Sequence, residues 1–187
     1  MQANPPSSAL PSSRLSNRDA LFCRNLALRL LSSPASEEEK DEAGKGLGRY
    51  PEGMVAVGAR RGERILAVVV KPLVRACPFP TVFYLSDKDL CRRASQLESA
   101  GAMKGWSQRL EKDEDLRRAY LRSHLMYLSF REEVAKLSGV PPYPSPISAG
   151  GMPERVKCLH ALLAQSLVMG PGINPIGDET AKEVGAW

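Results

Sequence analysis

Several signals of well-known chemistry are missing from this chain of 187 residues. It contains no P-loop, dinucleotide-binding glycine pattern, serine elbow or paired-carboxylate motif, so no motif identifies a reaction. Its four cysteines are widely spaced and form no C-x-x-C pair: Cys23, Cys77, Cys91 and Cys158. This spacing excludes a disulfide framework and favours a reducing compartment.

Long apolar segments are missing as well. The longest apolar runs, Ile65 to Val70 and the stretch around Leu159 to Met169, fall short of the ~20 residues that span a bilayer. The opening residues, MQANPPSSALPSSRLS, lack the apolar core of a signal peptide. We therefore expect a cytoplasmic protein with no membrane partner.

A strong charge of one sign is also absent. The 26 basic and 21 acidic residues leave a formal net charge of +5 and a sequence pI near 9.1. Basic and acidic residues alternate, as in EKDEDLRR at positions 111–118, and no basic arm of the kind that binds nucleic acid occurs. We do not expect nucleic-acid binding.

The chain divides into an extension and one domain, because its length and its 43% hydrophobic content suffice for one sizeable core. Residues 1–36 are predicted to be a disordered or partly helical N-terminal extension. Ser, Pro and Ala dominate residues 1–15, and Ser16 is placed to cap a helix over residues 16–31. Residues 37–187 are predicted to form a single α+β domain, whose first, acidic stretch either forms a short helix or stays solvated.

Two β-branched runs and a third short run predict the sheet. MVAVGAR, at residues 54–60, and RILAVVVKP, at residues 64–72, flank an Arg-Gly-Glu turn, which is a hairpin signal. TVFYL, at residues 81–85, supplies a third strand. The pattern predicts a small three-stranded, mainly antiparallel sheet.

About five helices are predicted to cover this sheet. The first carries Leu21 and Leu28 on its apolar side. The last is apolar on most sides, which indicates a central place in the fold, and Pro153 lies in its first turn. A stiff loop, GPGINPIGD, follows it. The helices after the sheet are expected over residues 86–101, with Ser86 as the cap, 103–110, 113–137 and 153–170.

Three long motifs resemble one protein family. They are GLGRYPEG at residues 46–53, CPFPTVFYL at residues 77–85, and the block from SAGGMPERVKCLHALLAQ to GPGINPIGD at residues 148–178. They are similar to the family called domain of unknown function 501. The resemblance covers about residues 46–178 and implies a bacterial, chiefly actinobacterial, source. The family is uncharacterised, so the resemblance implies neither an activity nor catalytic residues.

The segment from Gly150 to His160 is the strongest candidate for a ligand site. Glycine turns present backbone N–H groups, and the start of a helix adds partial positive charge. Arg155, Lys157 and His160 follow the Gly150 and Gly151 turn closely, so together they could hold a phosphate or carboxylate group. In the alternative, the two cations are solvated and His160 is a hydrogen-bonded core residue.

Asn174 and Asp178 join the candidate ligand-binding residues. Both belong to the rigid segment GPGINPIGD, which could line a pocket. In the alternative, their side chains only cap turns.

His124 and His160, which are the only two histidines, are the candidate catalytic residues. If two helices brought both rings to one cleft, they could shuttle a proton, because histidine titrates near neutrality. In the alternative, His124 packs its ring on Tyr120 and Tyr127.

The sequence KCLH does not predict a metal site. Positions two apart on a regular helix diverge by about 200°, so Cys158 and His160 are not expected to share an ion or to act as nucleophile and base. Cys158 is expected to be a small buried hydrophobic residue. No metal and no cofactor are predicted.

Two main functions stay open. We expect binding of an anionic small molecule that bears a phosphate or carboxylate group, and the sequence does not decide whether the chain also acts on it as an enzyme. The alternative is a non-catalytic interaction module, in which aromatic residues such as Trp106 and Tyr127 dock a partner protein.

Overall fold

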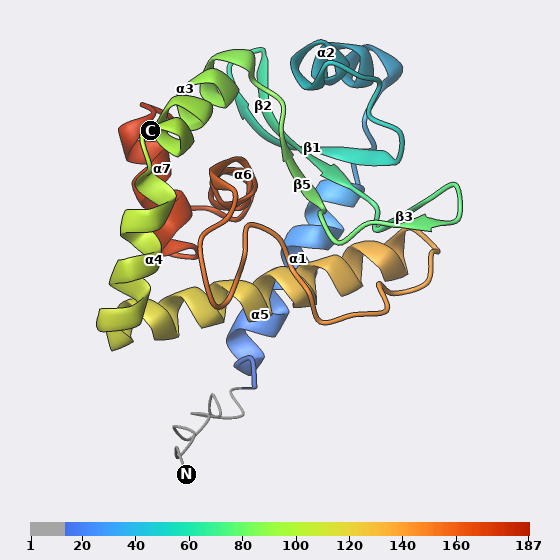
Figure 1. Cartoon of the computed structure of the whole chain (residues 1–187). Helices are drawn as coiled ribbons and strands as arrows, with labels where there is room; N and C mark the ends of the chain where they lie inside the picture. Colours follow the sequence, from blue (N-terminus) through green and yellow to red (C-terminus); the bar gives the residue numbers. More distant parts are fainter. Residues whose placement is uncertain (1–13) are drawn as a thin grey trace.

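The computed structural model describes residues 14–187 and has the α+β fold that the sequence predicts (Figure 1). The disorder predicted for residues 1–15 falls almost wholly outside the described residues. The helices of the described part are α1 (Asn17–Leu31), α2 (Glu37–Leu47), α3 (Lys88–Ser99), α4 (Ala102–Lys112), α5 (Glu114–Leu137), α6 (Leu159–Met169) and α7 (Pro175–Glu183). Its strands are β1 (Met54–Arg61), β2 (Arg64–Val70), β3 (Leu73–Val74), β4 (Cys77–Pro78) and β5 (Phe83–Leu85).

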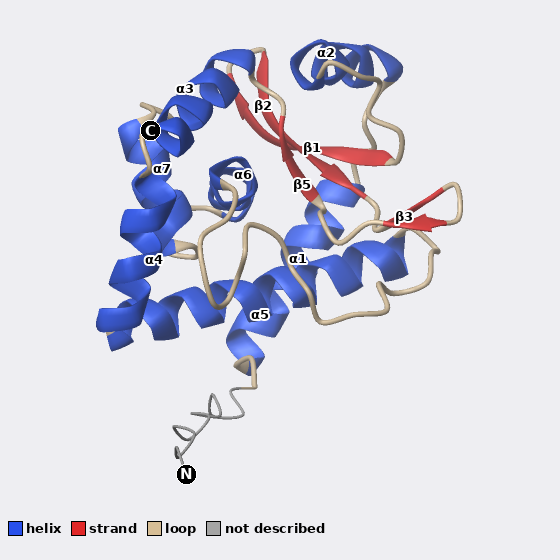
Figure 2. Cartoon of the chain, viewed as in Figure 1, coloured by secondary structure: helices blue, strands red, loops and turns tan. Residues whose placement is uncertain are grey.

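The three predicted strands form one antiparallel sheet, in the order β1-β2-β5, and β3 and β4 form a separate short hairpin (Figure 2). The predicted hairpin and third strand are therefore confirmed. Every residue from Ile65 to Val70 is buried. Ile65 and Val68 pack with Ala43 of α2, while Leu66 and Val69 belong to the main core. A strand buried on both faces explains the unbroken apolar run.

Helix α6 lies at the centre of the fold (Figure 1). It contacts α3, α7 and all three strands of the sheet, and most of its residues are buried. This confirms the central place predicted from its apolar surface. Among the described residues, no helix combines the length and the apolar character that crossing a membrane requires.

Helix α1 packs against α5 with a different face from the one predicted. Its buried residues are Cys23, Leu26 and Ala27, which follow the i, i+3, i+4 spacing of one helical face. Leu21 and Leu28 are 56% and 44% exposed, so the prediction of the apolar side was wrong.

Side chains cap the other helices much as the sequence indicates. Ser36 and Glu39 form a capping box at the start of α2, which decides that the acidic stretch is helical. Asp113 caps α5 as expected. The cap of α3 is Asp87 and not Ser86, because the Asp87 carboxylate accepts the N–H of Leu90, and carboxylates satisfy helix starts well.

The start of α6 differs from the prediction. The helix begins at Leu159 and not at Pro153, because tertiary hydrogen bonds hold the intervening residues in turns. The N–H of Val156 donates to Ser107 Oγ at 3.0 Å. The hydroxyl of Tyr120 donates to the carbonyl oxygen of Arg155 at 3.2 Å. These bonds engage backbone groups that a continuing helix would use itself.

Helix α7 was missed in the sequence. The segment predicted as a stiff loop contains its start, where Asn174 is the N-cap and Pro175 occupies the first turn. Asn followed by Pro is typical both of a turn and of a helix start. In this protein the pair starts a helix.

Candidate functional site

A cleft beside the glycine turn is lined by three of the six predicted ligand-binding residues, Gly151, Arg155 and Lys157. Its volume is about 560 Å³, and its lining includes His124, Ser148, Gly151, Arg155 and Lys157. We call it the Gly151 cleft. The structure thus brings four of the predicted site residues together, and Ser148 is an addition that the sequence did not single out.

The glycine turn gives the cleft its shape. Gly150 and Gly151 have φ angles of +68° and +92°. A Cβ atom on Gly151 would lie 2.5 Å from the carbonyl oxygen of Arg155, and one on Gly150 would lie 2.4 Å from Leu162 Cδ2. Both positions therefore need glycine for backbone conformation and for space. Gly150 packs against α6 and accepts the N–H of Lys157 at 2.7 Å, so its role is to fold the chain back.

The two exposed cations of the Gly151 cleft have no carboxylate partner within residues 14–187. Arg155 and Lys157 are exposed, and neither forms a salt bridge with a described residue. Arg109 and Arg122, by contrast, pair with Glu179 and Asp19. The lining also contains one acidic residue, Glu154.

A buried guanidinium lies behind the cleft. Arg131 is 3% exposed, and it donates to the carbonyl oxygens of Ile147 at 2.5 Å, Ser145 at 2.9 Å and Pro80 at 3.1 Å. It also packs over the ring of Tyr143 at 4.5 Å. Arginine stays protonated, so Arg131 adds positive charge next to Ile147, which is part of the cleft lining.

His124 forms a buried wall of the same cleft. It is 8% exposed, and its Nδ1 lies 2.8 Å from Ser148 Oγ. Burial, with the charge of Arg131 as a second cause, lowers the pKa of His124 below its ordinary value. The imidazole is therefore neutral near pH 7 and serves as a hydrogen-bonding group.

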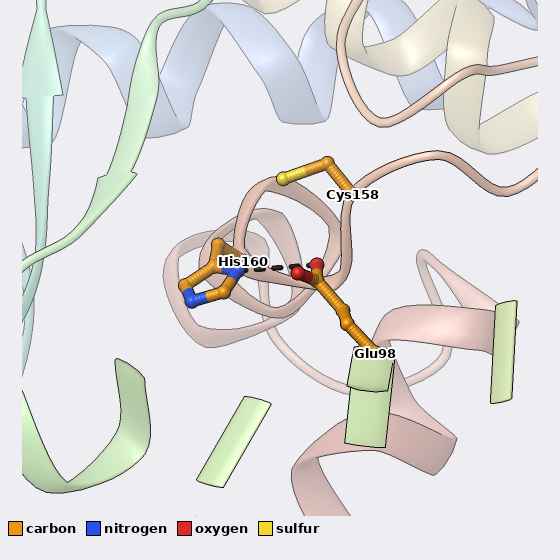
Figure 3. Close-up of side chains that lie close together, drawn as sticks. All are labelled: Glu98, Cys158 and His160. Atoms are coloured by element: carbon orange, nitrogen blue, oxygen red, sulfur yellow. Dashed lines mark hydrogen bonds and ion pairs between the residues drawn. The ribbon is translucent and has the colours of Figure 1, made fainter. Parts of the chain in front are cut away.

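His160 belongs to a second cluster, with Glu98 and Cys158 (Figure 3). One ligand atom of each side chain, a carboxylate oxygen, the sulfur and a ring nitrogen, lies within 4.8 Å of the other two. Glu98 comes from the last turn of α3, Cys158 is the N-cap of α6, and His160 lies in the first turn of α6. We call these residues the Cys158 cluster.

Both ring nitrogens of His160 are engaged. Nδ1 lies 3.1 Å from Glu98 Oε1, and Nε2 lies 3.1 Å from the carbonyl oxygen of Cys91 and 3.2 Å from Ser95 Oγ. Hydrogen bonding to Cys158, followed by the charge of Glu98, raises the pKa of His160 to about 9. His160 does not line the Gly151 cleft, so the two candidate catalytic histidines lie in different sites.

The Cys158 cluster removes the geometric argument against a shared Cys158 and His160 site. Only a regular helix through both residues would direct their side chains apart. Cys158 is instead extended, with φ −153° and ψ 109°, because the helix begins one residue later. Its thiol can therefore approach the His160 ring, and Cys158 is half-buried and not fully buried as predicted.

Asn174 and Asp178 carry hydrogen bonds inside the fold. The amide of Asn174 donates to Gln165 Oε1 at 2.8 Å, and its oxygen accepts the N–H of Gly177 at 3.0 Å. Asp178 accepts from Ser166 Oγ at 2.6 Å and from the N–H of Gly172 at 2.7 Å. Neither residue lines the Gly151 cleft. Both side chains hold turns together by hydrogen bonds, as in the alternative stated for them above.

The aromatic residues proposed for partner docking are buried. Trp106 is 5% exposed and donates to Glu179, and Tyr127 is fully buried and accepts the N–H of Val82. Neither side chain is therefore exposed at the surface for a partner to contact. Another cleft, of about 380 Å³, includes Tyr50 and Phe79 in its lining, but it is mostly apolar and lacks the gathered cations of the Gly151 cleft.

Comparison with models of known protein families confirms the resemblance that the sequence motifs indicate. The sequence model of a family described as proteins of unknown function, DUF501, matches residues 58–182. The chain belongs to the DUF501 family. The match begins after the GLGRYPEG motif and contains both the Gly151 cleft and the Cys158 cluster. No curated protein and no solved structure matches the chain.

Glu98 and Arg131 of this DUF501 chain carry no signal in the sequence that marks them as site residues. Glu98 lies 60 positions before Cys158 on an ordinary amphipathic helix, and no spacing rule connects the two. Arg131 is one of many arginines on α5 and its neighbours. Only tertiary packing singles out these two side chains.

Proposed function

We propose that the Gly151 cleft binds a small anionic molecule through a phosphate or carboxylate group. The observation that carries the proposal is a set of cations at this cleft that have no carboxylate partner in the described part of the chain. Arg155 and Lys157 line it, and Arg131 lies behind it. Like charges gathered in a hollow attract anions and gain free energy when an anion binds between them.

The size and the hydrogen-bonding groups of the cleft favour a ligand larger than a single ion. Its volume of about 560 Å³ falls in the range of small-molecule sites, roughly 300–1,000 Å³. Arginine suits phosphate and carboxylate groups, because its parallel N–H groups match two oxygens. Ser148 and neutral His124 supply further polar contacts. Glu154 in the lining disfavours a highly charged polyanion.

Thermal unfolding with added anions tests the proposal. The panel contains inorganic phosphate, pyrophosphate, nucleotides and small carboxylates. A ligand present at ~100 times its dissociation constant adds about 2.7 kcal/mol to the free energy of unfolding, which raises the melting temperature by several degrees in a chain of this size. We expect this shift in the wild type and its loss in an Arg155→Ala, Lys157→Ala variant.

An Arg24→Ala, Arg29→Ala variant is the matched control. It removes the same charge from exposed positions of α1 that do not line the cleft, so it should keep the shift. No shift with any anion in the wild type would overturn the proposal. An equal loss of the thermal shift in both variants would show that the shift depends only on net charge, and it would overturn the proposal as well.

A further inference from the structure

The geometry points to a second site: Glu98, Cys158 and His160 bind a divalent cation of the zinc type. Their three ligand atoms lie within 4.8 Å of one another (Figure 3). This inference rests on the Cys158 cluster alone and does not depend on the Gly151 cleft.

The donor set is the one that zinc uses. Thiolate sulfur, imidazole nitrogen and carboxylate oxygen bind zinc at about 2.0–2.3 Å, which places the ligand atoms of a tetrahedral site about 3.3–3.6 Å apart. Nδ1 of His160 and Oε1 of Glu98 are already 3.1 Å apart. A closure of about 1 Å by the remaining atoms would complete the site. Hard cations such as magnesium prefer oxygen ligands and would not select a thiolate.

The surroundings of His160 orient the ring for a metal. A ligating histidine usually donates its other ring N–H to a carbonyl or a carboxylate. The Nε2 of His160 lies 3.1 Å from the carbonyl oxygen of Cys91, so it carries a proton in that bond. Once the proton on Nδ1 is released, the lone pair of Nδ1 faces the Glu98 carboxylate at 3.1 Å, where a cation can take the place of that proton.

A backbone hydrogen bond also orients the carboxylate of Glu98. Its Oε1 accepts the N–H of Leu159 at 2.6 Å, which holds the carboxylate against the start of α6. Its Oε2 has no hydrogen-bond partner among the described residues and is available as a ligand atom. Within the described part of the chain, His160 is the only cationic group in salt-bridge contact with Glu98.

The arrangement fits a metal better than a thiol nucleophile relay. In a relay, the thiol and the carboxylate use opposite ring nitrogens of the histidine. Here Glu98 uses Nδ1, and the opposite nitrogen contacts the Cys91 carbonyl and Ser95. The nitrogen that would have to deprotonate a thiol is therefore already engaged.

The site keeps one position for water. The side chains of Glu98 and His160 are 23% and 28% exposed, so an ion can enter, and three protein ligands leave the fourth tetrahedral position open. Binding converts the Cys158 thiol to a thiolate and takes the place of any proton on Nδ1. The thiol proton, with the Nδ1 proton where one is present, is released to solvent.

Cobalt and zinc titrations of the full chain test the inference. With Co²⁺, the wild type should show a thiolate-to-cobalt charge-transfer band together with the visible bands of tetrahedral cobalt. With Zn²⁺, calorimetry in buffers that bind zinc only weakly should show one equivalent bound. The measured heat should depend on the ionisation enthalpy of the buffer, because protons are released. Cys158→Ser and Glu98→Gln should each weaken zinc binding by more than the ~10–100-fold that loss of an outer-shell partner costs.

Cys77→Ser is the control, because Cys77 is an exposed thiol on β4, and it should leave both signals unchanged. Circular dichroism of each variant shows whether it is folded. If Cys158→Ser does not fold, the cobalt spectrum of the wild type decides, and a missing charge-transfer band overturns the inference. Zinc affinity that is unchanged in a folded Cys158→Ser variant also overturns it.

Discussion

The hydroxyl of Tyr120 donates a hydrogen bond to the carbonyl oxygen of Arg155, at 3.2 Å. Tyr120 lies on α5 with no exposed surface, so this bond connects the segment after the glycine turn to the longest helix of the described residues. Without it, the backbone that carries Arg155 would lose one of its tertiary contacts. The cleft is therefore built by packing as well as by the local sequence.

Tyr120→Phe should lower both stability and anion affinity. Loss of a buried hydrogen bond costs about 0.5–1.5 kcal/mol, and the freed Arg155 segment should bind phosphate more weakly. Urea denaturation and the phosphate-induced thermal shift measure the two effects. Tyr143→Phe is the matched control, because the Tyr143 hydroxyl has no hydrogen bond within the described residues; it should change neither quantity.

Arg131→Met should be among the most damaging substitutions. It removes the Arg131 hydrogen bonds to the carbonyl oxygens of Pro80, Ser145 and Ile147. Each buried acceptor left unsatisfied costs about 1–3 kcal/mol, so the total loss should be about 3 kcal/mol or more. Chemical denaturation measures the loss. Arg118→Met, an exposed ion-pairing residue of the same helix, should cost less than about 1 kcal/mol. Similar losses in the two variants would contradict the role given to Arg131.

The stability of the protein should fall in mild acid because of His124. Its pKa is lowered in the folded state, so the unfolded chain takes up the proton at a higher pH. The free energy of unfolding from this group is therefore constant above about pH 6.5 and decreases as the pH falls below that value. Urea denaturation between about pH 7 and pH 5 should show a shallower decline for His124→Asn. Parallel pH profiles for the two proteins would refute this.

Gly151→Ala should destabilise the protein and disturb the cleft. Alanine at φ +92° places its Cβ 2.5 Å from the Arg155 carbonyl oxygen, and left-handed strain alone costs about 1–2 kcal/mol. Gly105→Ala is the control: it lies inside α4 with no atom within 4 Å of the added Cβ, and it should stabilise by about 0.5–1 kcal/mol. Thermal unfolding of both variants distinguishes a specific requirement at Gly151 from a general effect of glycine replacement.

The parts of the fold that depend on local pattern were predictable. The β-branched runs predicted the β1-β2 hairpin and β5. The apolar surface of α6 predicted its central place in the fold. Apart from His124, the residues that line the Gly151 cleft lie within positions 146–157, so Gly151, Arg155 and Lys157 could be predicted together from one short segment. His124 was a candidate because histidine titrates near neutrality, and no spacing in the sequence placed it beside this segment.

The parts that depend on tertiary contacts were not predictable. Pro153 would suit a helix start, but Ser107 and Tyr120 bind the backbone that follows it and delay the helix to Leu159. That delay moves Cys158 off the helix and next to His160. The third member of the cluster, Glu98, comes from a distant helix, so no sequence pattern could have connected it with KCLH.

Isothermal titration of inorganic phosphate into the full chain tests the central claim most directly. The account predicts saturable binding at one site in the wild type, at least about tenfold weaker in the Arg155→Ala, Lys157→Ala variant, a loss of roughly 1.4 kcal/mol. The Arg24→Ala, Arg29→Ala variant should bind as the wild type does. Absence of saturable binding in the wild type, or equal affinity in the cleft variant, would contradict the account.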